Sequence, residues 1–312
     1  MEIVLAIAFI GAIFMGVSIG ASSVAPAFAP VNISSSKSLR LALLAGIFAL
    51  AGALIQGGNV TNTIGSGVLV GEIQVIQAAF ILIVASSLVI VSVLTDYPMP
   101  TAFTVIGAVL GSSFCFGNEI VLSSIGTIVL FWVLTPVAAV ILGYGLARIL
   151  RKTLSKESSE RMIWVLLLLA GCYVAYTAGA ASVGLAVGPL AGLDYSLFLL
   201  LLVGGVSILA GAWMYSPRII HAVSYDYSNI GPRRSAAALL ASGLIAQVGI
   251  QLGVPVSFNL AIIAAVIGSG LVEGIGNKNN RKIGFTIFGW VSAFFLAAIL
   301  TFVLGKGWNL LF

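Results

Sequence analysis

Charged residues are scarce in this sequence, and their scarcity excludes most classes of protein. Only 7% of the 312 residues are charged, whereas 60% are hydrophobic. A soluble domain carries about 25% charged residues, so no soluble fold of this length could hide so much apolar surface. The apolar runs are long and do not alternate, which indicates helices rather than the strands of a membrane barrel. The sequence therefore predicts an all-α integral membrane protein.

Residues that catalyse reactions or bind metals are also rare. The chain has two cysteines, one histidine and nine acidic residues. Cys115 and Cys172 lie in apolar surroundings and are predicted to be packed thiols. No Ser-His-Asp spacing, Walker loop, CxxC or HExxH is present. The sequence thus predicts neither an enzyme nor an ATP-driven pump, and it implies no metal or cofactor.

Acidic residues are missing from the middle of every predicted span. A sodium site usually uses a carboxylate or several carbonyl oxygens, and a proton relay usually uses Asp, Glu or His. Asp96, two residues before Pro98, is the best placed carboxylate for coupling transport to protons. The alternative is that Asp96 is only an interfacial residue at the end of a segment.

Ten apolar segments are candidates to cross the membrane. Two shorter ones, 98–113 and 254–270, each begin at or just before a proline and are either broken crossings or re-entrant hairpins. The eight longer segments are 3–20, 38–56, 74–95, 121–150, 162–178, 195–215, 236–252 and 284–305.

The basic residues select a topology. If both short segments cross, each half has five crossings, and 13 of the 14 Lys and Arg residues fall on the cytoplasmic side when both termini lie outside. The polar segment 151–161 is then a cytoplasmic linker between a first repeat, 1–150, and a second, 162–312. An odd number of crossings per half inserts the two repeats in opposite orientations in the cell membrane.

Two motifs occur once in each half. Gly20–Pro30 and Gly179–Pro189 share six of eleven positions, and each is predicted to break a helix near mid-membrane. Pro98–Val109 and Pro255–Val266 each begin with proline, continue through a short polar patch and end as an apolar helix. Repeated motifs in oppositely inserted halves are typical of secondary transporters, whose substrate lies where broken helices of the two halves meet.

A helix start offers unpaired N–H groups and a partial positive charge, which together suit an oxyanion. Alternatively, the hydroxyls of these motifs only bond to their own backbone. A glycine-rich stretch, Gly57–Gly67, is predicted to be an external turn that either lines a vestibule or merely ends a helix. The predicted substrate-binding residues are Ser22, Ser23, Thr101, Ala102, Ser182, Ser257, Phe258 and Asn259, with Thr104 as a further donor.

These motifs resemble the inorganic phosphate transporter (PiT) family, in the right order and over nearly the whole chain. That family carries Gly-Ala-Asn-Asp-Val-Ala-Asn-Ala twice, which resembles Gly20–Ala27 and Gly179–Ala186 here. It also carries Pro-Val-Ser-Thr-Thr-His twice, which resembles Pro98–Phe103 and Pro255–Leu260. The resemblance implies two inverted repeats around a central anion site.

The departures from the family pattern bear on the substrate. Where the family has Asn-Asp, which it uses to hold sodium, this chain has Ser22-Ser23 and Ala181-Ser182. Phosphate near neutral pH carries protons that a carboxylate can accept, whereas sulfate is fully deprotonated and needs only donors. The chain therefore resembles the family's sulfate permease branch.

The leading hypothesis is a sulfate permease that imports sulfate by alternating access, with one half rocking against the other. Coupling to protons is favoured over coupling to sodium, and a homodimer is left open. The alternatives are a phosphate or related oxyanion transporter of the same fold, and an anion channel.

Overall fold

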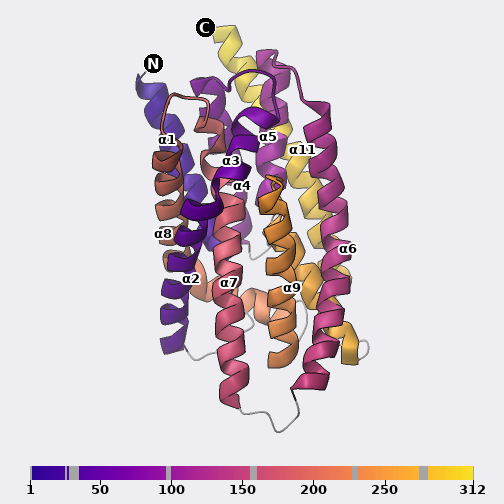
Figure 1. Cartoon of the computed structure of the whole chain (residues 1–312). Coiled ribbons are helices and arrows are strands. Elements are labelled where there is room, and N and C mark those ends of the chain that lie inside the picture. The colour runs from indigo at the N-terminus through magenta and orange to yellow at the C-terminus, as the bar shows by residue number, and fades with distance from the viewer. Residues whose placement is uncertain are drawn as a thin grey trace.

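The protein is a bundle of helices that lie roughly along one axis (Figure 1). A computed structural model describes residues 2–24, 27, 35–95, 100–154, 160–226, 231–273 and 280–311. Each of the ten predicted segments is helical. The long helices are α1 (Glu2–Ile19), α2 (Ser35–Gln56), α4 (Val75–Leu94), α5 (Thr101–Phe116), α6 (Leu122–Thr153), α7 (Glu160–Val187), α8 (Leu197–Asp226), α9 (Pro232–Gln251), α10 (Phe258–Gly270) and α11 (Asn280–Leu311).

Short helical pieces also occur among the described residues. They are a π-helical turn η1 (Gly20–Val24), α3 (Gly58–Asn62), a second π-helical turn η3 (Thr63–Gly67), and two 3₁₀ turns, η4 (Gly188–Leu190) and η5 (Leu271–Glu273). α2 and the α3–η3 arm are bent by 63° at a short break. Residues Gly57–Gly67 were predicted to be an external turn. That prediction is wrong, because all but the first of them are helical.

Within the described residues, six helices are long and apolar enough to span a membrane, and the bent α2–α3 pair would make a seventh. The six are Glu2–Val24, Val75–Leu94, Leu122–Thr153, Arg161–Leu190, Leu197–Met214 and Ile287–Leu311. α5 and α10 are shorter, at 16 and 13 residues. Their lengths of about 24 and about 20 Å fall short of a hydrocarbon core of about 30 Å.

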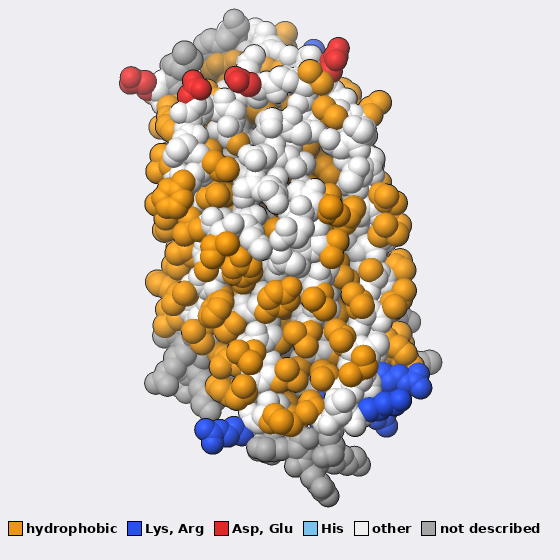
Figure 2. Space-filling view, in the orientation of Figure 1, with side chains coloured by type: hydrophobic (Ala, Val, Ile, Leu, Met, Phe, Trp, Pro, Cys, Tyr) orange, Lys and Arg blue, Asp and Glu red, His pale blue; other side chains and the backbone are white. Residues whose placement is uncertain are grey.

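The two ends of the bundle differ in charge. Figure 2 shows a broad band of hydrophobic side chains, with Asp and Glu at the end that carries the termini and most of the visible Lys and Arg at the other. α1 begins at the acidic end, whereas α7 begins at the basic end (Figure 1). The first helices of the two halves therefore run in opposite directions.

The two sequence halves are interwoven. α1 packs on α8 and α2 on α7, so the first two helices of each half form one bundle, here called the central bundle. α5 packs on α11 and α10 on α6, and α4 and α9 lie beside these pairs. These six helices are here called the flanking bundle, and it contacts the central bundle where α4 packs on α1 and α9 packs on α7.

Glycines make the contacts between halves close. At each crossing, the position that a Cβ would occupy is taken by a backbone atom of the partner helix, so a larger residue could not be accommodated without moving the helices apart. The pairs are Gly20 with Ile208, Gly211 with Val17, Gly52 with Tyr176, Gly179 with Ala49, Gly107 with Phe294, Gly111 with Ala298, Gly143 with Ala265, and Gly268 with Val140.

The predicted break at the second Gly-Ala motif is wrong. α7 continues through Gly179 to Val187, and the chain leaves the helix only in the 3₁₀ turn at Gly188–Leu190. At the first motif, α1 gives way to the π-helical turn Gly20–Val24. The physical reason is that small residues permit a break but do not require one, and here their small size serves helix contacts.

We expect Gly52→Ala to destabilise the protein, because the added methyl group would collide with the carbonyl of Tyr176. Overpacking of this kind costs about 1–3 kcal/mol, so the melting temperature of the purified protein in detergent should fall. Gly126→Ala on α6 is the control, since no atom lies within 4 Å of the added group. Equal melting temperatures for the two variants would contradict this account of the α2–α7 crossing.

Candidate functional site

All eight predicted binding residues are buried in the structure. Each is at most 3% exposed: Ser22, Ser23, Thr101, Ala102, Ser182, Ser257, Phe258 and Asn259. They come from four places in the fold, namely η1, α7, and the first turns or caps of α5 and α10. Asp96, the predicted coupling residue, lies outside the described residues.

The two serines of η1 bond to each other and weakly to their own helix. Their Oγ atoms are 3.3 Å apart, and Ser22 Oγ lies 3.5 Å from the carbonyl of Ile19. A π-helical turn displaces the backbone from the regular α-helical ladder and is common at functional sites. The long contact to Ile19 is weak by geometry, so little holds the Ser22 hydroxyl to the backbone.

α5 and α10 begin in nearly the same way. Their N-cap residues, Pro100 and Ser257, have backbone angles of φ −76°, ψ 104° and φ −76°, ψ 109°. Ser257 Oγ accepts a hydrogen bond of 3.4 Å from the N–H of Leu260, whereas Pro100 supplies no side-chain cap to α5. The hydroxyl of Thr104 donates to the carbonyl of Thr101 at 2.8 Å, so Thr104 satisfies its own helix.

The two short helices start inside the molecule and end at opposite ends of it. At the end of α5, Asn309 near the C-terminus donates to the carbonyl of Cys115 at 3.3 Å. Beyond the end of α10, Arg151 donates to the carbonyl of Val272 at 3.4 Å. The N-termini of both helices, with their partial positive charges, therefore point into the interior from opposite directions.

A tryptophan on α6 joins these two helix starts. The indole N–H of Trp132 donates to the carbonyl of Pro255 at 3.2 Å, just before α10. Its ring stacks on Phe103 in the first turn of α5, with ring centroids 3.8 Å apart and an interplanar angle of 15°. Phe294 of α11 meets the same indole edge-on at 6.1 Å. A single indole thus separates the first turn of α5 from the segment that leads into α10.

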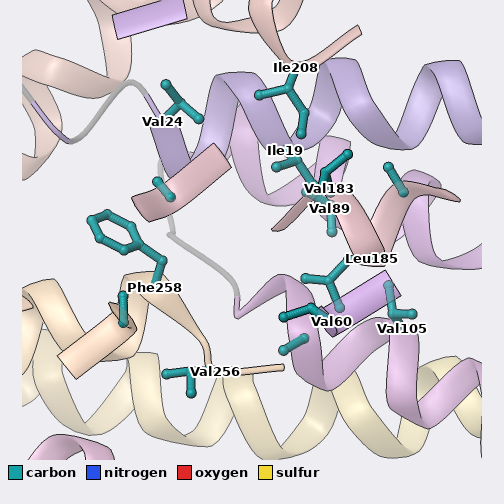
Figure 3. Packing of buried hydrophobic residues seen from close by; sticks show 14 of the residues in the cluster. Ile19, Val24, Val60, Val89, Val105, Val183, Leu185, Ile208, Val256 and Phe258 are labelled. Atoms are coloured by element: carbon teal, nitrogen blue, oxygen red, sulfur yellow. The ribbon is translucent and has the colours of Figure 1, made fainter. Parts of the chain in front are cut away.

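The apolar neighbours of all four motifs belong to one core. Figure 3 shows Val24, Val60, Leu185 and Phe258 among the buried residues of this core. Val105 and Val183 belong to the same cluster of buried residues. These residues flank the predicted hydroxyls along the chain, so the motifs of both halves border one continuous apolar core.

The interior carries no fixed charge in the part of the chain that the structure describes. Its buried polar residues are Ser, Thr, Gln and Asn, and no described Asp, Glu, Lys, Arg or His is buried. A ligand there would meet hydroxyls, amides and helix dipoles only. Such groups can donate to an anion, and their oxygens and the backbone carbonyls could hold a cation weakly.

The α2–α3 bend reaches the loop before α10. Asn59 donates to the carbonyl of Ile250 at 3.3 Å, and Gln247 donates to Gln56 at 2.9 Å. Gly253, with φ of +67°, lies against Asn59 and Thr63. The glycine-rich stretch is therefore attached to the chain that enters the Pro255 motif, and it does not form an isolated external loop.

Sequence reasoning missed Trp132. The sequence did contain a signal, which is the repetition of this tryptophan in the second half. Trp290 of α11 is the counterpart of Trp132, since each is the eleventh residue of its helix and the two are 158 positions apart. The Gly-Ala motifs are 159 apart. Thr135, one turn after Trp132, was also missed; it is buried, and its hydroxyl has no hydrogen-bond partner among the described residues.

Comparison with known sequences identifies relatives along nearly the whole chain. The model of the phosphate transporter family matches twice, over residues 19–166 and 153–301. A protein of Methanocaldococcus jannaschii that is provisionally named a phosphate permease is 26% identical, over 92% of each chain. The sulfate permease CysP of Bacillus subtilis is also 26% identical, over 95% of this chain and 86% of its own.

A solved structure has the same fold. It is described as the sodium-dependent phosphate transporter, and it matches with a TM-score of 0.88 over the full length of both chains at 20% identity. This likeness establishes that the chain has an all-helical membrane transporter fold. At 20% identity it establishes the fold alone.

Replacing Trp132 with Phe should lower both stability and transport. The variant keeps an aromatic ring to stack on Phe103 but loses the donor to the Pro255 carbonyl, a loss of about 1 kcal/mol. We expect a small drop in melting temperature and a several-fold drop in anion uptake by proteoliposomes. Trp164→Phe, at an exposed indole on α7, is the control and should leave both unchanged.

Proposed function

Because this chain belongs to the phosphate transporter family and is therefore an anion permease, we propose that its substrate is sulfate. We propose further that it imports sulfate across the cell membrane by alternating access. The observation that carries the proposal is the position of Trp132. Its indole contacts Phe103 at the start of α5 and the Pro255 carbonyl just before α10, in an interior where no described charged residue is buried.

The chemistry of the interior favours an anion that needs donors only. Thr101 and Ala102 lie in the first turn of α5, where helix N–H groups have no partner within the helix, and α5 has no side-chain cap. Ser22 and Ser23 add hydroxyls from η1. Hydroxyl and backbone donors at helix N-termini are a common solution for binding phosphate and sulfate.

The absence of buried carboxylates from the described residues favours sulfate over phosphate. A protonated phosphate carries hydrogen atoms that need acceptors, and a carboxylate is the strongest acceptor among side chains. Sulfate is fully deprotonated and needs none. The similarity to a sulfate permease along most of the chain agrees with this preference.

The interwoven packing suggests which parts move. Rocking of residues 1–150 against 162–312 would separate the glycine contacts of four crossings, so we propose motion of the central bundle against the flanking bundle instead. Each bundle contains helices of both halves, and Trp132 joins the two sides of the flanking bundle near the proposed site.

The proposed orientation places both termini outside the cell and the linker 151–161 inside. The gathering of Lys and Arg at the end opposite the termini supports it, because basic residues stay on the cytoplasmic side. We propose proton coupling rather than sodium coupling, since the carboxylates that would hold sodium are absent from Ser22-Ser23 and Ala181-Ser182.

Phosphate transport is the alternative function, because the family model and the M. jannaschii relative are both named for phosphate.

Competition between the two anions separates these alternatives. Purified protein in proteoliposomes should take up labelled sulfate, and excess unlabelled sulfate should suppress uptake more strongly than phosphate at pH 7. Stronger inhibition by phosphate would assign the other substrate, and the absence of counterflow would indicate a channel. An imposed pH or sodium gradient in the same vesicles identifies the co-ion.

The double variant Ser23→Ala and Ser182→Ala should reduce sulfate uptake at least tenfold, because two hydrogen bonds to a charged ligand are lost. Ser86→Ala is the control, since this buried hydroxyl bonds to the carbonyl of Ile83 in its own helix at 3.1 Å. Folding is checked by gel filtration. Normal uptake by the double variant would show that these serines do not bind the substrate.

A further inference from the structure

A polar cavity lies at the basic end of the molecule, away from the proposed transport site. It has a volume of about 510 Å³ and is lined by Ala147, Arg151, Ile163, Gly231, Pro232, Arg233, Arg234 and Val272. These residues come from the end of α6, the start of α7, the start of α9 and the turn after α10. Of these eight described residues, three are arginines and none has a carboxylate.

The arginines are presented on fixed parts of the fold. Arg151 in the last turn of α6 donates to the carbonyl of Val272 at 3.4 Å, which holds its guanidinium at the wall of the cavity. Arg233 and Arg234 are half-buried in the first turn of α9. Arginine binds phosphate with two parallel N–H donors, and it does so better than lysine because its donors form a rigid fork.

The start of α9 adds to the positive potential. Gly231 is the N-cap and offers no side chain, and Pro232 occupies the first helical position. The partial positive charge of this helix end therefore faces the same cavity as the three guanidinium groups.

The surroundings of the cavity are those of the membrane surface. Ala147, Ile163 and Val272 form an apolar side of its lining. α6 is little covered by protein, with 17% of its spanning window buried. Lys and Arg gather here, over the lower ends of α6 and α9, directly below the hydrophobic band (Figure 2). A ligand in this position would have a polar group in the cavity and apolar chains against α6.

We propose that this cavity binds the phosphate of an anionic phospholipid in the leaflet on the basic side of the membrane. Basic pockets between membrane helices at that level suit such headgroups. The lipid's acyl chains lie along the exposed face of α6, and its phosphate bridges α6 and α9. This binding is independent of which anion the protein transports.

The test uses the purified full chain in a neutral detergent, with phosphatidylglycerol as the probe and phosphatidylcholine for comparison. Native mass spectrometry should show one phosphatidylglycerol retained in preference to phosphatidylcholine. Arg151→Gln and Arg233→Gln should each weaken its binding about tenfold, the value of one charge-assisted hydrogen bond. Arg148→Gln removes the same charge from α6 at a residue that does not line the cavity, and it should change binding less than twofold.

Three results would overturn the proposal. One is equal retention of both lipids, and another is an equal effect of Arg148→Gln, which would mean attraction by the surface charge alone. The third is displacement of phosphatidylglycerol by millimolar inorganic phosphate, which would indicate a site for a soluble anion. If Arg233→Gln, at the start of α9, fails to fold, the comparison of Arg151→Gln with Arg148→Gln on α6 still tests the proposal.

Discussion

The arrangement of the molecule depends on backbone contacts that only glycine permits. Without a hydrophobic driving force between helices in lipid, close approach and van der Waals contact hold a membrane bundle together. Here each close crossing joins a helix of the first half to one of the second, as Gly52 does with Tyr176 and Gly107 with Phe294. The halves are therefore interlocked, and neither could form its native packing alone.

This interlocking determines where the proposed anion site lies. The starts of α5 and α10 approach each other from opposite ends of the molecule, because each packs on the last helix of the other half. Trp132 fills the space between them and contacts Phe103 and Pro255. The proposed site thus depends on an aromatic side chain that lies between two helix N-termini and sets their separation.

Much of the fold could be predicted from the sequence. The apolar runs were sufficient to locate the ten long helices, and the burial of Ser22, Thr101 and Ser257 followed from their place in repeated motifs. The continuation of α7 as a helix through Gly179 could not be predicted, because a glycine permits a close helix crossing as readily as a helix break. Trp132 could not be assigned a role either, since stacking depends on a three-dimensional neighbour that no local pattern specifies.

The neutral interior has an energetic consequence for transport across a polarised membrane. A membrane potential of 100 mV, negative inside, opposes each entering negative charge by about 2.3 kcal/mol. A divalent anion carried alone would therefore be held back by about 4.6 kcal/mol, which lowers its accumulation by roughly three orders of magnitude. Since no described Asp, Glu, Lys, Arg or His is buried in the interior, accumulation of such a substrate against the potential would have to be driven by cations that enter with it.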